Sequence, residues 1–215
     1  MQKTKHMLFL LLLSASNLLF MQNIMAEAEK NKILILGDSL SAGYGIERGK
    51  NWVDLLAERL AANGSEFILV NSSISGDTTA NGLSRLQGEI ERHQPVIIII
   101  ELGANDGLRG MPLSYIQGNL EKLIHLSLNA DTQVLLVGMR IPPNYGKKYT
   151  QQFHSIFTSL AQQHQINLLP FLLQGVAGQP ELIQADGLHP NQEAQPRIMQ
   201  NVWEQLSPML SRYES

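Results

Sequence analysis

Five short, continuous runs rich in Ile, Leu and Val recur along the chain, and they constrain its fold more than any other feature. They occupy residues 32–36, 66–70, 96–100, 132–137 and 166–169. Longer stretches with apolar residues at helical spacing alternate with them, at residues 52–60, 83–90, 114–128, 151–163 and 192–210. Strands that are apolar on both faces are typical of parallel sheets covered by helices on both sides. The sequence therefore predicts an α/β fold, a single doubly wound, flavodoxin-like domain with a five-stranded parallel sheet between helices.

The N-terminal segment has a different composition and is typical of a signal peptide. A positively charged start precedes a mostly apolar run at residues 7–21, and residues 26–28 read Ala-Glu-Ala, the A-x-A form of a signal-peptidase site. The alternative is an uncleaved membrane anchor, which needs about 20 apolar residues, whereas this run is shorter and polar residues interrupt it. We expect residues 1–28 to be a cleaved signal peptide, and residues 29–215 to form a periplasmic or secreted domain without stable membrane insertion.

Charge and cysteine content exclude several classes of function. The chain of 215 residues has a formal net charge of −3, which argues against nucleic-acid binding because phosphate contacts need a basic surface. It contains no cysteine, so disulfides, iron–sulfur clusters, thiolate zinc sites and cysteine nucleophiles are all excluded. Covalent catalysis would have to use an oxygen or nitrogen nucleophile. Nothing in the sequence demands more than a monomer.

Polar, glycine-containing segments follow the predicted strands. They lie at residues 37–41, 71–78, 103–107 and 186–190. Each alone could be an ordinary turn, because Gly, Asp, Ser and Asn are common turn residues. In doubly wound folds, however, ligands bind at the carboxyl ends of the strands. Four such segments that together carry a hydroxyl, small amide donors and an Asp-His pair predict an active site at this edge of the sheet.

The same four segments resemble the sequence blocks of the GDSL/SGNH hydrolase family. Gly-Asp-Ser-Leu-Ser stands at residues 37–41, Ser-x-x-Gly ends at Gly76, Gly-x-Asn-Asp occupies 103–106 and Asp-x-x-His occupies 186–189. They occur in the family's order, and the longer blocks are similar to the bacterial exported acyl-CoA thioesterase I/lysophospholipase/arylesterase group. The resemblance implies the SGNH-hydrolase form of the fold. It also implies a serine esterase that hydrolyses carboxylic esters or thioesters of acyl chains through an acyl-enzyme.

The resemblance also implies roles for individual residues. Ser39 would be the nucleophile, His189 its general base, and Asp186 the carboxylate that orients the imidazole. The backbone N–H groups of Ser39 and Gly76 and the side-chain amide of Asn105 would form the oxyanion hole. This chemistry needs no cofactor and no metal, and we expect neither.

Apolar residues in the same loops indicate the substrate class. They are Ile74, Leu108, Met111, Ile141, Pro142 and Tyr145. An apolar lining suits an acyl chain, so the expected partner is a small acyl ester or a lipid. A carbohydrate acetylesterase of the same family is the alternative, and it would have a more polar and aromatic cleft. A catalytically silent binding module is expected to lack a member of the triad, and all three are present.

Other motifs have ordinary structural interpretations. The glycines of residues 43–51 match neither phosphate-binding motif, because their spacing is wrong and Asn51 replaces the Ser or Thr of a P-loop. Asp186 and His189 have no second histidine at metal-ligand spacing. We interpret the remaining internal histidines as surface or core residues without a carboxylate at a suitable spacing. They are His93, His125, His154 and His164.

Overall fold

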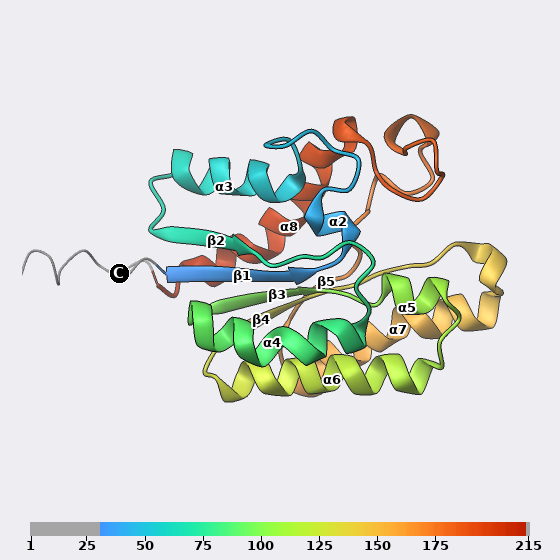
Figure 1. The fold of residues 1–215 in the computed structure, drawn as a ribbon, viewed down its shortest axis with the longest axis horizontal. Helices are drawn as coiled ribbons and strands as arrows, with labels where there is room; N and C mark the ends of the chain where they lie inside the picture. Colours follow the sequence, from blue (N-terminus) through green and yellow to red (C-terminus); the bar gives the residue numbers. More distant parts are fainter. Residues whose placement is uncertain (1–30, 214–215) are drawn as a thin grey trace, which may run out of the picture. The chain divides into compact units, whose positions relative to one another are not determined.

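The computed structural model describes residues 31–213, and the expected signal peptide lies outside this part of the chain. The described residues form a five-stranded, all-parallel sheet in the order β2-β1-β3-β4-β5. The strands are β1 (Asn31–Gly37), β2 (Phe67–Asn71), β3 (Ile97–Glu101), β4 (Gln133–Val137) and β5 (Asn167–Leu169). The predicted doubly wound α/β fold is confirmed (Figure 1).

Apolar side chains bury the middle of the sheet on both faces. Ile33–Leu36 of β1 and Ile97–Ile100 of β3 are completely inaccessible to solvent, which is why these strands are continuous rather than alternating apolar runs. β3 pairs with both β1 and β4, so it lies at the centre of the sheet. The residue that ends β3 is Glu101, a fully buried carboxylic acid at the carboxyl edge of the sheet.

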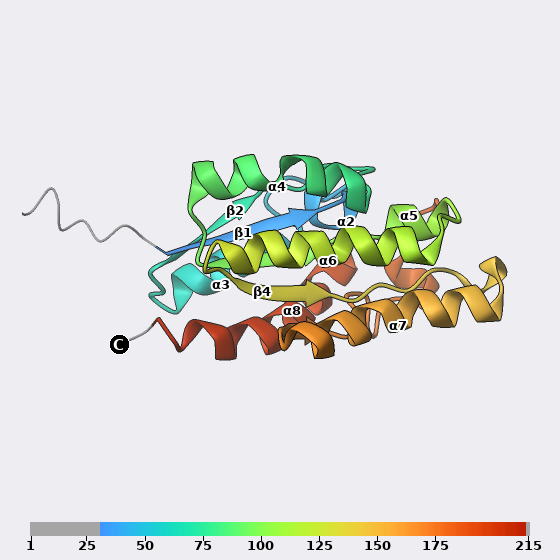
Figure 2. The ribbon, with the colours of Figure 1, turned by 90° about the horizontal axis from the view of Figure 1, so that it is seen from below.

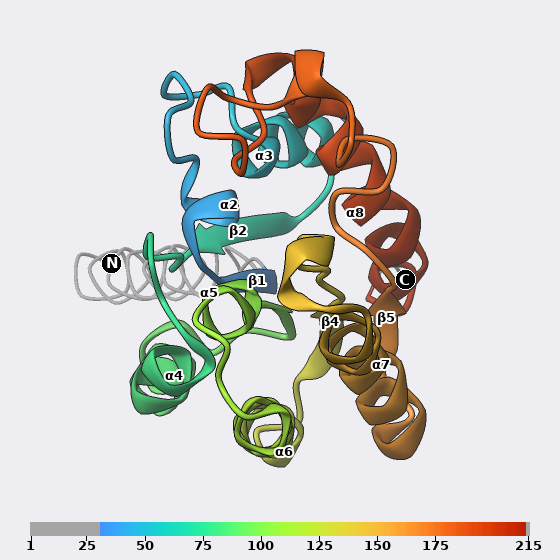
Figure 3. The same cartoon turned by 90° about the vertical axis from the view of Figure 1, so that its right-hand side faces the viewer.

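Helices cover both faces of the sheet (Figures 2 and 3). On one face lie α3 (Trp52–Ala62) and α8 (Gln195–Leu210), which contact each other. On the other lie α4 (Thr79–His93), α6 (Leu113–Asn129) and α7 (Lys147–His164). No helix in the described part of the chain is both long and apolar enough to span a bilayer.

Helix α4 begins four residues earlier than the apolar spacing of residues 83–90 predicts. The cause is a capping box, in which the Thr78 hydroxyl accepts from the Asn81 backbone N–H while the Asn81 side chain accepts from the Thr78 N–H. Such a box satisfies donors at a helix start without any apolar residue. At the C-terminus, the stretch predicted as one helix is a 3₁₀ turn, η3 (Gln192–Ala194), followed by α8.

Two short helices that the sequence analysis does not predict lie at the carboxyl edge of the sheet. α2 (Ser39–Ala42) directly follows β1, and α5 (Ala104–Leu108) follows β3. The strand order changes direction between these two strands, because β1 leads outward to β2 whereas β3 leads to β4 on its other side. The residues of the predicted site therefore begin at the switch point of the fold, where doubly wound proteins bind ligands.

Candidate active site

Ser39 is held at the first position of α2, immediately beyond the end of β1. Asp38 caps this helix by accepting from the Leu40 N–H at 3.0 Å. Gly37 is required by its surroundings, since a Cβ there would lie 2.8 Å from both Glu101 Oε2 and Ser41 Oγ. The strand can therefore turn sharply into the helix only because residue 37 has no side chain. This turn presents Ser39 at the edge of the sheet.

Ser39, His189 and Asp186 form a continuous chain of hydrogen bonds. Ser39 Oγ lies 2.9 Å from His189 Nε2, and His189 Nδ1 lies 2.6 Å from Asp186 Oδ2. An ionised carboxylate can only accept, so Nδ1 carries the proton and Nε2 accepts from the serine hydroxyl. Asp186 also accepts from the backbone N–H groups of His189 and Leu188. These two bonds and the imidazole lower the pKa of Asp186 from 3.8 to about 2.

Tyr44 and Gln184 support the loop that carries His189, and the sequence analysis missed both. The Tyr44 ring lies 4.7 Å from the His189 ring, centre to centre. The Gln184 side-chain amide donates to the carbonyls of Tyr44 and Pro190, both at 2.9 Å. Gln184 N–H also donates to the His189 carbonyl at 2.8 Å. The loop after α2 and the loop before α8 are thus tied together around the imidazole.

Two of the three predicted oxyanion-hole donors have no acceptor in the described part of the chain, whereas the third is already engaged. Among the described residues, no acceptor takes the backbone N–H of Ser39 or of Gly76. Gly76 has a φ of +85°, a conformation that favours glycine. The third predicted donor, the side-chain amide of Asn105, already donates to Asp38 Oδ2 at 3.0 Å and to the Asp77 carbonyl at 2.9 Å. Asp38 therefore connects α2 to the amide.

A buried pair of carboxyl groups lies under Ser39. Glu101 Oε2 accepts from the Asp38 N–H at 3.2 Å and from the Ser41 hydroxyl at 2.6 Å. Burial, followed by the charge of Asp38, raises the pKa of Glu101 well above 4.5. Burial also raises the pKa of Asp38 from 3.8 to about 6, although its hydrogen bond from the Leu40 N–H opposes the shift. Ser41 is fully buried as a donor to Glu101.

Asp106 organises the adjacent loop. Its two carboxylate oxygens accept from the backbone N–H and the hydroxyl of Thr79, at 2.8 and 2.7 Å. Asp106 is completely buried in α5, the helix that also carries Asn105. It thereby joins the start of α4 to α5 and fixes the loop that holds Asn105.

A cavity of about 80 Å³ opens beside Ser39 and is lined mainly by aliphatic side chains. Three of the predicted substrate-binding residues, Leu108, Ile141 and Pro142, line it. A second hollow of about 400 Å³ shares Ile141 and Pro142 with the first and continues the apolar surface away from Ser39. Further lining residues that the sequence analysis missed follow the ends of β4 and β5 or lie within the His189 loop. They are Met139, Arg140, Leu173 and Leu188.

The other three predicted substrate-binding residues do not line either hollow. Tyr145 donates through its hydroxyl to the Leu108 carbonyl at 2.8 Å, and Met111 is partly buried against the core while its carbonyl accepts from Tyr149. Ile74 is 51% exposed in the loop after β2. Tyr145 and Met111 thus fasten the loops that shape the cavity.

Residues 43–51, whose glycines resemble those of a nucleotide-binding loop, have a structural role. Gly43 ends α2 in the left-handed conformation, and Asn51 caps α3 by accepting from the N–H groups of Val53 and Asp54. Asn51 therefore occupies a capping position where a P-loop has its hydroxyl.

The interpretation of the internal histidines is wrong in one respect, since two of them do have a carboxylate at helical spacing. Glu89 lies one turn before His93, and the two side chains are 3.3 Å apart. Glu121 likewise lies one turn before His125. Its carboxylate is 3.4 Å from His164, which comes from another helix.

Comparison with known proteins agrees with this geometry. Residues 35–196 match the GDSL-like Lipase/Acylhydrolase family. An arylesterase of Vibrio mimicus is 46% identical over 181 residues, which is 84% of this chain and 90% of the relative. The thioesterase 1/protease 1/lysophospholipase L1 of Escherichia coli K12 is 40% identical over 86% of this chain and 87% of its own length. The crystal structure of esterase EstA from a Pseudoalteromonas species, inhibited by monoethylphosphonate, is 42% identical. It superposes with a TM-score of 0.81 over 84% of this chain and 99% of that chain.

Proposed function

The chain belongs to the GDSL-like lipase/acylhydrolase family and is an ester hydrolase, and we propose that it cleaves acyl esters and thioesters through Ser39, His189 and Asp186. The observation that carries this proposal is the hydrogen-bonded chain of the three side chains beside an aliphatic cavity. A hydroxyl is a weak nucleophile until a base accepts its proton, and His189 Nε2 is within reach to do so.

The reaction follows from these positions. As Ser39 Oγ attacks the acyl carbonyl, its proton moves to His189 Nε2, and Asp186 stabilises the resulting imidazolium. The negative charge on the former carbonyl oxygen is met by the N–H groups of Ser39 and Gly76 and by the Asn105 amide. Collapse expels the alcohol or thiol, which takes the proton from His189 and leaves an ester on Ser39. Water then attacks this ester by the same steps and releases the acid.

The aliphatic lining supports an acyl chain rather than a sugar as the bound group. Met139, Ile141, Pro142 and Leu173 surround the cavity next to Ser39, and the larger hollow extends this surface. A carbohydrate acetylesterase would need polar and aromatic groups at these positions. The complete triad also argues against a silent binding module.

A panel of p-nitrophenyl esters of increasing chain length tests the proposal together with Ser39→Ala. We expect activity to extend to medium and long acyl chains, and Ser39→Ala to lower kcat roughly 10³- to 10⁶-fold, because removing a triad member leaves only binding and oxyanion stabilisation. A serine-directed phosphonate should label Ser39 in the wild type. Labelling of Ser41 instead, or a strict preference for acetyl esters, would contradict the proposal.

We also propose that the enzyme is exported, is cut after Ala28 and acts as a monomer in the periplasm. The A-x-A form of residues 26–28 and the apolar run before it support this proposal. N-terminal sequencing of the periplasmic protein should start at Glu29, and its mass in solution should be that of one chain. A full-length, membrane-bound product would contradict the proposal.

A further inference from the structure

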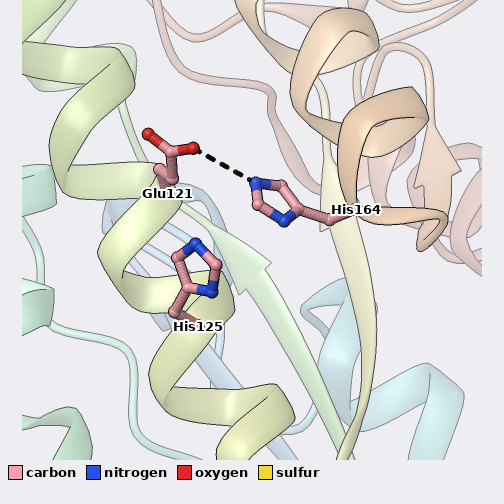
Figure 4. A group of neighbouring side chains, drawn as sticks. All are labelled: Glu121, His125 and His164. Atoms are coloured by element: carbon pink, nitrogen blue, oxygen red, sulfur yellow. Dashed lines mark ion pairs between the residues drawn. The ribbon is translucent and has the colours of Figure 1, made fainter.

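Two histidines and a glutamate from neighbouring helices converge at a place remote from Ser39 (Figure 4). Glu121 and His125 lie one turn apart on α6, and His164 is the last residue of α7. One potential ligand atom from each of the three lies within 4.8 Å of the others. The rings of His125 and His164 stand edge to face with their centres 4.7 Å apart. The three side chains thus bridge two helices that are separate in sequence.

The side chain of His164 is nearly buried, yet its Nε2 atom, which faces Glu121, makes no hydrogen bond in the described part of the chain. Its side chain is only 9% exposed, and its Nε2 atom has no hydrogen-bond partner among the described residues. The carboxylate oxygen Glu121 Oε1 lies 3.4 Å away, too far for a good hydrogen bond, and it already accepts from Gln163 at 2.7 Å. A buried polar atom without a hydrogen-bond partner is costly, so the unsatisfied Nε2 atom of His164 calls for an explanation.

We propose that Glu121, His125 and His164 bind a divalent transition-metal ion, with Zn²⁺ as the natural occupant. Two imidazole nitrogens and a carboxylate oxygen are an established zinc donor set. Tetrahedral bonds of about 2.0 Å place neighbouring ligand atoms about 3.3 Å apart, close to the separation of His164 Nε2 and Glu121 Oε1. The exposed His125 closes the third position by a small side-chain rotation, and water completes the coordination.

The metal ion would act on stability rather than on the esterase reaction. α7 starts near the carboxyl edge of the sheet and runs back to His164, three residues before β5 begins. His164 therefore lies at the end of the domain opposite to Ser39. An ion held by both helices joins α6 to α7, and binding to the folded state alone raises the melting temperature.

Calorimetric titration of metal-free protein with Zn²⁺ tests the proposal, using residues 29–215 and the variant His125→Asn. Because His125 is exposed, its replacement removes its ring contact with His164 but leaves the apolar core intact. We expect one Zn²⁺ per chain in the wild type, a rise in melting temperature on binding, and a loss of at least roughly tenfold in affinity in the variant. His164→Asn should weaken binding similarly. His93→Asn is the matched control, since His93 pairs with a glutamate on its own helix but belongs to no cluster of three potential ligands among the described residues.

Several other results would contradict the proposed metal site. Unchanged Zn²⁺ affinity in both His125→Asn and His164→Asn would overturn the site, as would the absence of saturable binding in the wild type. Binding that survives in both variants but is lost in His189→Asn would assign the ion to the triad instead. Esterase activity of the His125 and His93 variants should equal that of the wild type, which shows that they are folded.

Discussion

Asn105 has both hydrogens of its side-chain amide engaged before any substrate binds. One is donated to the Asp38 carboxylate and the other to the Asp77 carbonyl. To stabilise a tetrahedral intermediate, the amide has to share or exchange one of these bonds as the oxyanion forms. Asp38, which also caps α2 through Leu40, thus fixes the amide relative to Ser39, the proposed nucleophile. Asp38 acts as a positioning residue in this arrangement.

Replacing Asn105 by alanine should therefore slow the chemical step. If Asn105 donates to the oxyanion as proposed, this hydrogen bond strengthens in the transition state, so we expect kcat to fall roughly 10²- to 10³-fold with a smaller change in KM. Asn105→Asp should be at least as poor, because it adds a carboxylate beside Asp38 and removes the donor. Steady-state kinetics and a melting curve on the same preparation measure both effects. A lowered melting temperature with a normal kcat would mean that Asn105 only shapes its loop.

Glu101 makes the stability of the protein depend on pH. Its pKa is raised in the folded state by burial and by the nearby charge of Asp38, whereas in the unfolded chain it returns to about 4.5. Between these two values the folded protein retains a proton that the unfolded chain has lost. The free energy of unfolding therefore falls as pH rises through this window, by at most about 1.4 kcal/mol per pH unit for one proton.

The variant Glu101→Gln should remove this contribution. Its carbonyl oxygen can still accept from Asp38 N–H and the Ser41 hydroxyl, but it cannot ionise. In urea unfolding from pH 4 upward, the free energy of unfolding of the variant should decline less steeply than that of the wild type. The difference between the two free energies should therefore grow with pH. The exposed Glu58→Gln serves as control and should follow the wild type. Parallel curves for Glu101→Gln and the wild type would show that Glu101 has an ordinary pKa.

At the scale of elements, the triad depends on two loops that hold each other in place. Gln184 joins them through its bonds to the Tyr44 and Pro190 carbonyls. Gln184→Ala should let His189 move relative to Ser39, and we expect kcat to fall roughly 10- to 100-fold because a displacement of about 1 Å can have that effect. The measurement is kcat at saturating p-nitrophenyl ester. The exposed Gln87→Ala is the control, and an equal kcat in both variants would refute the coupling.

The long elements were predictable because their periodicity is strong, whereas the elements that carry the site were not. All five strands appear within a residue or two of their expected positions, since each is a continuous apolar run. α2 and α5 have four and five residues, too few to show a helical period. Their Gly, Asp, Ser and Asn residues indicate turns when considered alone. Their helical form depends on caps and burial that only the folded chain supplies.

The triad and its oxyanion donors could be proposed from the ordered blocks, but their supporting contacts could not. Tyr44 reaches His189 from the other end of the chain, and Glu101 meets Ser41 across 60 residues of sequence. The cluster around His164 is similar, since Glu121 comes from a different helix. Contacts between distant segments leave no local pattern, so they become visible only when the sheet order and the helix packing are known.

Across the whole molecule, the strand order gathers exposed apolar side chains around one edge of the sheet. Six large apolar side chains are markedly exposed in the described residues, and four of these lie in loops that follow β1, β2, β4 and β5. They are Tyr44, Ile74, Tyr145 and Leu188. A parallel sheet brings such loops together because all strands end at the same edge. The surroundings of Ser39 are therefore suited to apolar substrates beyond the cavity itself.

Selectivity for acyl-chain length should reside in the larger hollow rather than at the triad. Ala177 lines this hollow but not the cavity beside Ser39, and its side chain is small and exposed. Ala177→Trp would place an indole in this hollow and leave the hydrogen bonds between Ser39, His189 and Asp186 intact. We expect kcat/KM for p-nitrophenyl acetate to stay within about twofold, while that for the decanoate falls roughly 10- to 200-fold, since a few methylene groups lose their apolar surroundings.

The control for this prediction is Ala61→Trp, which adds the same side chain at an exposed position on α3. This variant should leave kcat/KM unchanged for both the acetate and the decanoate. The ratio of the two kcat/KM values is the informative quantity, because it cancels differences in active enzyme concentration. An equal loss with both esters would mean that the new side chain disturbs the triad. An unchanged ratio would mean that the acyl chain extends from Ser39 along a surface other than the hollow that Ala177 lines together with Ile141 and Leu173.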